Sequence, residues 1–169
     1  MATYLRIGAS GLLAEETTVS AGGMGNANKI PQLDANGQLA ESMMPTGIGA
    51  DTAVYPTSEN LSAGDQVNIY NNAGTLTCRK ADAGTNNYAA HGYVKASVTS
   101  PANATVYFDG ACAGTFAATD AGKPVFLSAT AGATTLTPVS GTGKIHQQIG
   151  TVISLTAFDF EPQPPIVLA

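Results

Sequence analysis

The sequence predicts an all-β protein, a small antiparallel β-barrel or sandwich preceded by an extended, mostly irregular N-terminal arm. From about Asp51 onward, short β-branched and aromatic runs are broken by Gly, Asn, Asp and Pro at intervals of roughly 8–12 residues. The same half of the chain shows no sustained period of about 3.6 residues, so we expect helix there only as single turns. With 169 residues, the chain has room for one domain and an appendage.

Residues 1–50 differ in sequence pattern from the rest of the chain and are predicted to form the arm. Gly22–Asn28 is glycine-rich, Asp34–Gly37 carries an Asn-Gly turn signal, and Gln38–Met44 is long enough for about one and a half helical turns before a proline. Such a segment cannot bury its apolar side chains by itself, so they either fold back on the following domain or dock on another protein. The candidate docking residues are Tyr4, Leu5, Ile7, Leu12, Leu13, Ile30, Leu33, Leu39, Met43 and Met44.

Residues 51–160 are predicted to form the β-domain. In QVNIY the alternation places Val67 and Ile69 on one face, and Asn71–Gly74 then turns the chain into the next strand. Gly122–Thr137 (GKPVFLSATAGATTLT) is predicted to be a second hairpin that carries no chemical group. The expected strands are Gln66–Tyr70, Thr75–Lys80, Gly92–Val98, Thr105–Phe108, Pro124–Ser128, Thr134–Thr137, Ile145–Ile149 and Thr151–Phe160.

Residues 161–169 form a proline-rich C-terminal tail, EPQPPIVLA. Proline imposes an extended path, and the apolar tip would be costly to expose to water. Two interpretations follow from this pattern. The tail is either a disordered end or a strap laid on a neighbouring subunit, with Ile166, Val167 and Leu168 as its contact residues.

Composition and charge exclude several classes of function. The net charge is −5, and the one adjacent basic pair is Arg79–Lys80, so we expect no nucleic-acid partner. We expect no membrane partner either, because no run of about 18 apolar residues exists and the N-terminus lacks the apolar core of a signal peptide. Charged residues make up 11% of the chain against roughly 25% in typical soluble domains, which favours burial of surface in an oligomer or a larger assembly.

Residues that could carry chemistry are few. Cys78 and Cys112 lack a CxxC motif and are predicted to be buried free thiols, the alternative being a mutual disulfide in an oxidising compartment. His91 and His146 stand in no catalytic or metal-ligand spacing and are predicted to be structural or exposed.

Known site motifs are missing as well. The sequence has no GxSxG, HExxH, Walker or DxDxDG motif, and the glycine-rich stretches lack the strand-to-helix context of a phosphate loop. We therefore predict no catalytic, cofactor-binding or metal-binding residue, and no enzyme. Tyr88, Tyr93 and Tyr107 could line one face of a barrel as a sugar platform, although tyrosines more commonly occupy a core or an interface.

Two parts of the sequence resemble structural proteins of tailed bacteriophages, and together they cover about three quarters of the chain. The β half looks like the small β-barrel domain of phage capsid decoration proteins, which recurs in head-fibre and tail-associated proteins. NANKIPQLDANGQLAESMMP (Asn26–Pro45) is similar to the linker that precedes such domains. The stretches that carry the β-domain resemblance, in order, are Leu61–Ala83, Gly92–Val98, Thr105–Gly110, Pro124–Pro138 and Ile149–Phe160.

The resemblance implies a non-enzymatic virion component on the phage capsid surface, assembled in the host cytoplasm. Members of this family are commonly homotrimers whose extended arm grips the major capsid protein. KIHQQIG departs from the family pattern, in which a more apolar and basic strand ending in Gln-Arg is expected. Gln147 and Gln148 therefore leave the barrel's edge or interface in question at this point.

Two hypotheses of different class result. The leading one is a capsid decoration (cement) protein that binds the major capsid protein and copies of itself, without any cofactor. The alternative is a phage head-fibre or tail-associated host-recognition module that binds a cell-surface glycan through loops such as Gly84–His91.

Overall fold

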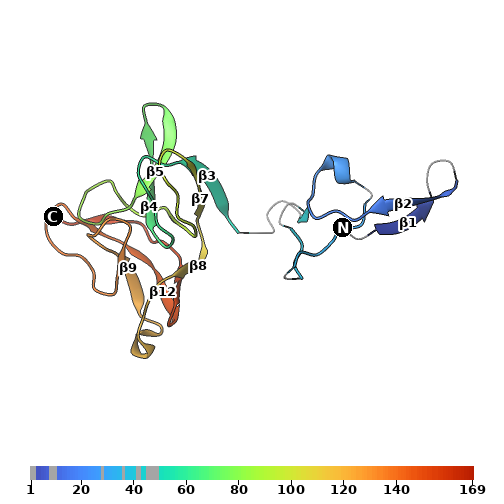
Figure 1. The fold of residues 1–169 in the computed structure, drawn as a ribbon. Coiled ribbons are helices and arrows are strands. Elements are labelled where there is room, and N and C mark those ends of the chain that lie inside the picture. Colours follow the sequence, from blue (N-terminus) through green and yellow to red (C-terminus); the bar gives the residue numbers. More distant parts are fainter. Residues whose placement is uncertain (1–2, 8–10, 28, 36, 41–42, 45–49) are drawn as a thin grey trace. The chain divides into compact units, whose positions relative to one another are not determined.

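The computed structural model describes residues 3–7, 11–27, 29–35, 37–40, 43–44 and 50–169. The chain divides into two compact units, residues 1–49 and residues 50–169 (Figure 1). This division falls one residue from the predicted boundary between the arm and the β-domain. The two units are described separately.

The N-terminal unit holds a regular β-hairpin. Strands β1 (Thr3–Ile7) and β2 (Leu13–Thr17) pair antiparallel, with Ile7 opposite Leu13. A single 3-10 turn, η1 (Met24–Asn26), follows. The predicted, mostly irregular arm therefore contains one regular β-hairpin, whose two five-residue strands the sequence pattern does not predict.

The turn predicted at Asp34–Gly37 is confirmed. The Gly37 amide donates to the Asp34 carbonyl over 3.0 Å, and the Gln38 amide donates to the Asp34 carboxylate over 2.9 Å. Gly37 has a φ of 76°, which glycine adopts without strain. The helical turns predicted over Gln38–Met44 lie partly outside the described residues.

Residues 50–169 form two five-stranded antiparallel sheets and one two-stranded sheet, so the all-β prediction is confirmed (Figure 1). The first sheet has the order β3-β7-β6-β4-β5 and the second has the order β10-β9-β12-β13-β8, while β11 pairs with β14. The bounds are β3 Thr52–Pro56, β4 Gln66–Asn72, β5 Thr75–Lys80, β6 Gly92–Val94, β7 Asn103–Tyr107, β8 Gly110–Ala113, β9 Pro124–Leu127, β10 Thr134–Thr135, β11 Ile145–His146, β12 Gln148–Ser154, β13 Ala157–Phe160 and β14 Ile166–Val167, with a 3-10 turn η3 at Ala118–Asp120.

Both predicted hairpins are confirmed. In the β4–β5 turn the central residues Ala73 and Gly74 have φ values of 50° and 93°, the left-handed conformation that a two-residue type I′ turn requires. The β9–β10 pair places Thr134 opposite Leu127. The predicted single strand Thr151–Phe160 is wrong, because the chain reverses between Ser154 and Ala157 and forms the β12–β13 hairpin.

The structure favours the sandwich over the barrel, because the first sheet is curled but not closed. Its edge strands β3 and β5 lead to a single parallel bridge between Thr57 and Cys78, and the Ser58 amide donates to the Cys78 carbonyl over 3.1 Å. The curled sheet encloses a small core of Leu61, Val67, Cys78, Val94, Ala104 and Val106.

A larger core joins the two sheets. Alternation along β6 sends Val94 into the small core and Tyr93 into the larger one, so all three residues of this strand are buried. Glycine is needed at position 92, because a Cβ atom there would clash with Val106 Cγ1 at 2.5 Å and with the Tyr107 carbonyl oxygen at 2.6 Å. The larger core consists of Tyr93, Cys112, Val125, Leu127, Ile145, Ile149, Val152, Phe158 and Phe160, with four alanines at positions 81, 83, 89 and 90.

Tyr93 links the sheets through its hydroxyl group as well as its ring. The side chain has no exposed area, and its ring centroid lies 5.2 Å from that of Phe160. The hydroxyl oxygen lies 2.9 Å from the Ala111 carbonyl oxygen on β8 and 3.2 Å from that of Asp109. Burial raises the pKa of Tyr93 to about 12, so the phenol stays a neutral donor.

The C-terminal tail lies on its own domain. Ile145 pairs with Val167 and His146 with Ile166, and the Gln163 amide donates to the Gln148 carbonyl over 2.9 Å. This corrects the interpretation of the tail as a disordered end, whereas the strap on a neighbouring subunit stays a prediction. Of the three predicted strap residues, Ile166 and Val167 remain exposed by 60% and 51%, and Leu168 is half-buried.

We predict that Tyr93→Phe lowers the free energy of unfolding by about 1–2 kcal/mol, because it removes the part-buried hydrogen bond from the Tyr93 hydroxyl to the carbonyl oxygens of the β8 region. Tyr55→Phe is the matched control, since Tyr55 packs on the small core and its hydroxyl has no hydrogen-bond partner among the described residues. Urea unfolding of both variants measures the difference. Equal losses in the two would contradict the role assigned to the Tyr93 hydroxyl.

Candidate functional site

The β1–β2 hairpin of the N-terminal unit carries an exposed apolar face. Strand alternation and the register place Leu5, Ile7 and Leu13 on one side of the hairpin, with exposed fractions of 68%, 72% and 72%. Thr3, Glu15 and Thr17 lie on the same side and border these three aliphatic side chains, with Glu15 opposite Leu5. Among the described residues of 1–49, none is buried. A two-stranded hairpin is at best marginally stable in water without a surface to pack on, so this face is suited to docking.

The opposite face of the hairpin is polar and contacts the segment that follows it. Glu16 accepts from Arg6 at 2.9 Å and from Lys29 at 3.4 Å, and the Ile30 amide donates to the Tyr4 hydroxyl over 3.3 Å. These contacts fasten the hairpin to the rest of its unit by the polar side, and they leave the apolar side uncovered within the described part of that unit.

The predicted docking residues are largely exposed in the structure. Leu12, the residue before β2, is 71% exposed. Tyr4 and Met43 are half-buried, and Tyr4 belongs to the polar face rather than the apolar one. Outside the hairpin, the exposed members are Ile30 at 49%, Leu33 at 53%, Leu39 at 41% and Met44 at 42%.

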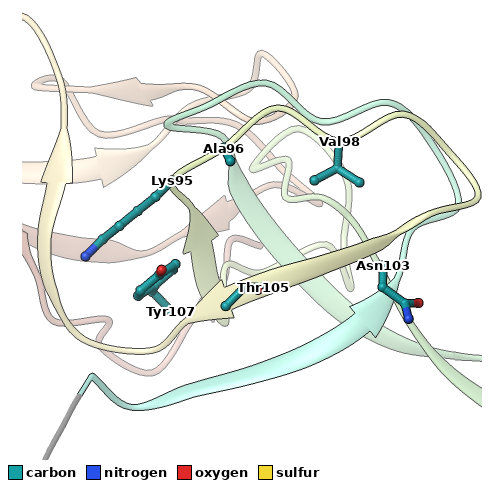
Figure 2. A pocket seen from close by; sticks show the side chains of 6 residues that line it. All are labelled: Lys95, Ala96, Val98, Asn103, Thr105 and Tyr107. Carbon is teal, nitrogen blue, oxygen red and sulfur yellow. The ribbon is translucent and has the colours of Figure 1, made fainter. Parts of the chain in front are cut away.

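A surface pocket lies on the first sheet where β6 departs from β7 (Figure 2). After Val94 the chain bends away, because Val98 pairs with Leu61 and the Val94 carbonyl accepts from the Gly64 amide over 2.8 Å. The space left between β7 and the bent segment measures about 240 Å³. The residues that line it are Lys95, Ala96, Val98, Asn103, Thr105 and Tyr107.

The predicted tyrosine platform does not form. Tyr93 lies inside the core, and Tyr107 lines the surface pocket. Tyr88 instead covers the Arg79 guanidinium, whose Cζ lies 3.4 Å from its ring centroid and 4.1 Å from that of Tyr70. Arg79 is therefore held between two rings as part of the fold and is not offered to a ligand.

The loop proposed for glycan binding, Gly84–His91, is anchored at its C-terminal half. The Asn68 side-chain amide donates to the Ala89 carbonyl over 2.8 Å, and the His91 amide donates to the Val67 carbonyl over 2.8 Å. Residues 84–87 remain exposed. The structure does not bring these exposed loop residues together with the lining of the surface pocket.

Gln147 is a buried structural residue, where the sequence suggested an edge or an interface. Its Oε1 accepts from the Ala90 amide over 2.8 Å, and its Nε2 donates to the carbonyls of Ala90 (3.0 Å) and Gln163 (3.1 Å). The side chain is 3% exposed, so these bonds form in a protected environment. One amide thus connects the loop before β6, the β11–β12 junction and the C-terminal tail.

The histidines and cysteines occupy structural positions. The His91 Nδ1 accepts from the Ile69 amide over 3.0 Å, and the His146 ring lies 5.3 Å from the Phe126 ring. Both cysteines are free and buried, and burial raises the pKa of the Cys78 thiol and raises that of Cys112 to about 11.

Within the part of the chain that the structure describes, there is no cluster of three or more His, Cys, Asp and Glu residues that could hold a metal ion. Among those same residues, no helix has the length and apolar character needed to cross a bilayer.

Comparisons with protein-family models, with curated proteins and with solved structures found no match.

We predict that Gln147→Met lowers the free energy of unfolding by about 2–4 kcal/mol, because both backbone groups of Ala90 lose their partners in a buried site. Gln148→Met serves as the control, since the neighbouring Gln148 makes one long side-chain bond of 3.5 Å to the Gly150 carbonyl. Denaturant unfolding of the two variants measures the effect, and a small loss for Gln147→Met would refute the assigned role.

We also predict that His91 makes the domain less stable at mildly acidic pH. Burial lowers the pKa of His91, and the Ile69 amide requires an unprotonated Nδ1. Below the ordinary value of about 6.5 the unfolded chain therefore binds more protons than the folded one, and stability falls as the pH decreases.

Urea unfolding at neutral and mildly acidic pH tests this. His91→Gln should flatten the loss of stability between the two conditions, whereas His146→Gln should preserve it. If the wild type and His91→Gln lose stability equally on acidification, His91 is not the responsible group.

Proposed function

We propose that this chain is a non-catalytic structural component of a tailed-bacteriophage virion. More specifically, it acts as a capsid decoration (cement) protein whose N-terminal unit docks on the major capsid protein and whose β-domain associates as a homotrimer. The sequence resemblance supports the class of protein. The exposed apolar face of the β1–β2 hairpin supports the mode of attachment.

The observation that carries the proposal is the distribution of apolar side chains between the two units. Residues 50–169 contain both cores, whereas the described residues of 1–49 contain no buried residue and include exposed leucine, isoleucine and methionine side chains. Side chains that the fold does not bury are available to a partner. Fully burying one such side chain contributes about 1.5–3 kcal/mol.

Docking through a small face fits the work of a cement protein. Association costs free energy, because the partners lose translational and rotational freedom, and this cost offsets part of the free energy gained by burying apolar side chains. One hairpin alone therefore binds weakly. Three linked hairpins in a trimer bind far more tightly, because the first contact raises the effective concentration of the others. The proposal includes no nucleic-acid or membrane partner.

Leu13→Ser tests the docking face in the full-length chain. We expect the affinity for empty capsids of the parent phage to fall by about tenfold or more, because a side chain that is 72% exposed in the free chain is no longer buried on binding. Leu76→Ser is the matched control, since Leu76 is also largely exposed (57%) but lies on β5 of the β-domain, outside the N-terminal unit. Co-sedimentation with capsids measures both. Unchanged binding of Leu13→Ser, or equal losses, would rule out this face.

Removing residues 1–49 provides a second test. Residues 50–169 keep both hydrophobic cores and should still unfold cooperatively, but they should no longer sediment with capsids. Light scattering on the same fragment reports the trimer proposed for the β-domain. Capsid binding by the fragment would contradict the docking role of the N-terminal unit.

A further inference from the structure

We propose that the pocket between β7 and Lys95–Val98 binds one acidic sugar residue, such as a uronic acid unit of a bacterial surface polysaccharide. The proposal rests on the side chains of the β-domain and does not depend on the docking of the N-terminal unit. It gives the virion protein a second contact, directed at a cell surface.

The wall formed by β7 offers polar groups along one line. Asn103, Thr105 and Tyr107 alternate with the buried residues Ala104 and Val106, so the three polar side chains lie on the same side of the strand (Figure 2). The side chains of Asn103 and Thr105 have no hydrogen-bond partner among the described residues. An amide and a hydroxyl group can each donate and accept, which matches the neighbouring hydroxyl groups of a sugar.

Lys95 supplies a positive charge at one end of this line. Its Nζ lies 4.1 Å from the centroid of the Tyr107 ring and 5.8 Å from that of Tyr93, so the ammonium group is held above an aromatic surface. Figure 2 shows the Lys95 side chain reaching over Tyr107. Lys29, Lys80 and Lys123 form ion pairs with carboxylates, whereas Lys95, like Lys144, forms none with the described residues. A carboxylate of a ligand can therefore form the ion pair with the Lys95 ammonium group.

The wall formed by Ala96 and Val98 and the volume of the pocket limit the class of ligand that can bind. Ala96 and Val98 contribute apolar side chains, against which the C–H groups of a sugar ring can pack. A volume of about 240 Å³ lies below the roughly 300–1,000 Å³ of typical ligand pockets and suits a single ring rather than a drug-sized molecule. A nucleotide is disfavoured, because phosphate recognition calls for more than one cation or for a cradle of backbone amides.

Titration of the full-length chain with trigalacturonate, followed by amide chemical shifts, tests the proposal. We expect the shifts to concentrate in Lys95–Val98 and Asn103–Tyr107, with a Kd on the order of 1 mM for such a small and open site. The neutral trisaccharide maltotriose should bind more weakly, and acetate alone should not saturate the site. Equal binding of the two trisaccharides, saturation by acetate alone, shifts elsewhere or no binding would each overturn the proposal.

Substitutions separate the pocket from a general effect of charge. Lys95→Gln should weaken trigalacturonate binding by roughly three- to tenfold, since it removes one charge-assisted contact at an exposed position. Asn103→Ala should weaken it as well. Lys123→Gln makes the same change of charge at a site outside the pocket and should bind as the wild type does. If Lys95→Gln and Lys123→Gln behave alike, the pocket is not the site.

The two proposals fail separately. Capsid co-sedimentation reports on the hairpin face, and neither Lys95 nor Asn103 belongs to that face. A chain that binds trigalacturonate but no capsid would keep the sugar site and lose the cement role. A chain that binds capsids but no trigalacturonate would do the reverse.

Discussion

The two-sided burial of β6 is the constraint on which the β-domain depends. This three-residue strand sends Tyr93 into the core between the sheets and Val94 into the core of the curled first sheet. The Tyr93 hydroxyl then bonds across to β8, which sets how closely the second sheet approaches. Since Val94 is the last residue of the strand, the same element also determines where the chain leaves β7 and opens the surface pocket.

Local signals in the sequence predict the hairpins, whereas the pairing of strands that are distant in the sequence cannot be predicted from them. Asn71–Gly74 and Gly122–Thr137 each contain their own turn residues, so the β4–β5 and β9–β10 pairs could be predicted from short windows. Strand β8 is Gly-Ala-Cys-Ala and has weak intrinsic β-propensity, and it becomes a strand because β13 pairs with it. The β12–β13 reversal at Leu155–Thr156 contains no Gly, Pro or Asn and therefore gave no signal.

Polarity alone misplaced Gln147, because a sequence pattern shows the character of a side chain but not its partners. The three backbone groups that satisfy this amide belong to Ala90 and Gln163, which lie 57 and 16 residues away along the chain. A buried polar side chain is tolerated when its hydrogen bonds are made. The glutamine is therefore explained by backbone groups that are distant in the sequence, and its polarity does not mean that it is exposed. No local sequence signal indicates the surface pocket either, because its walls are β7 and Lys95–Val98, and their separation depends on the distant pairing of Val98 with Leu61.

The exposed apolar residues of the two units have different physical meaning. On the β-domain, the exposed large apolar side chains are distributed over β3, β5, β12, β14 and the β12–β13 turn of a unit that has already buried two cores, and exposed side chains of this kind are normal. They are Val54, Leu76, Ile153, Leu155, Ile166 and Val167. In the N-terminal unit, Leu5, Ile7 and Leu13 share one face, while no described residue of that unit is buried. A hairpin of this kind gains little from its own interior, so most of the stabilisation open to it comes from the surface on which it docks. Folding and attachment are therefore expected to be linked in this unit, whereas the β-domain is stable by its own cores.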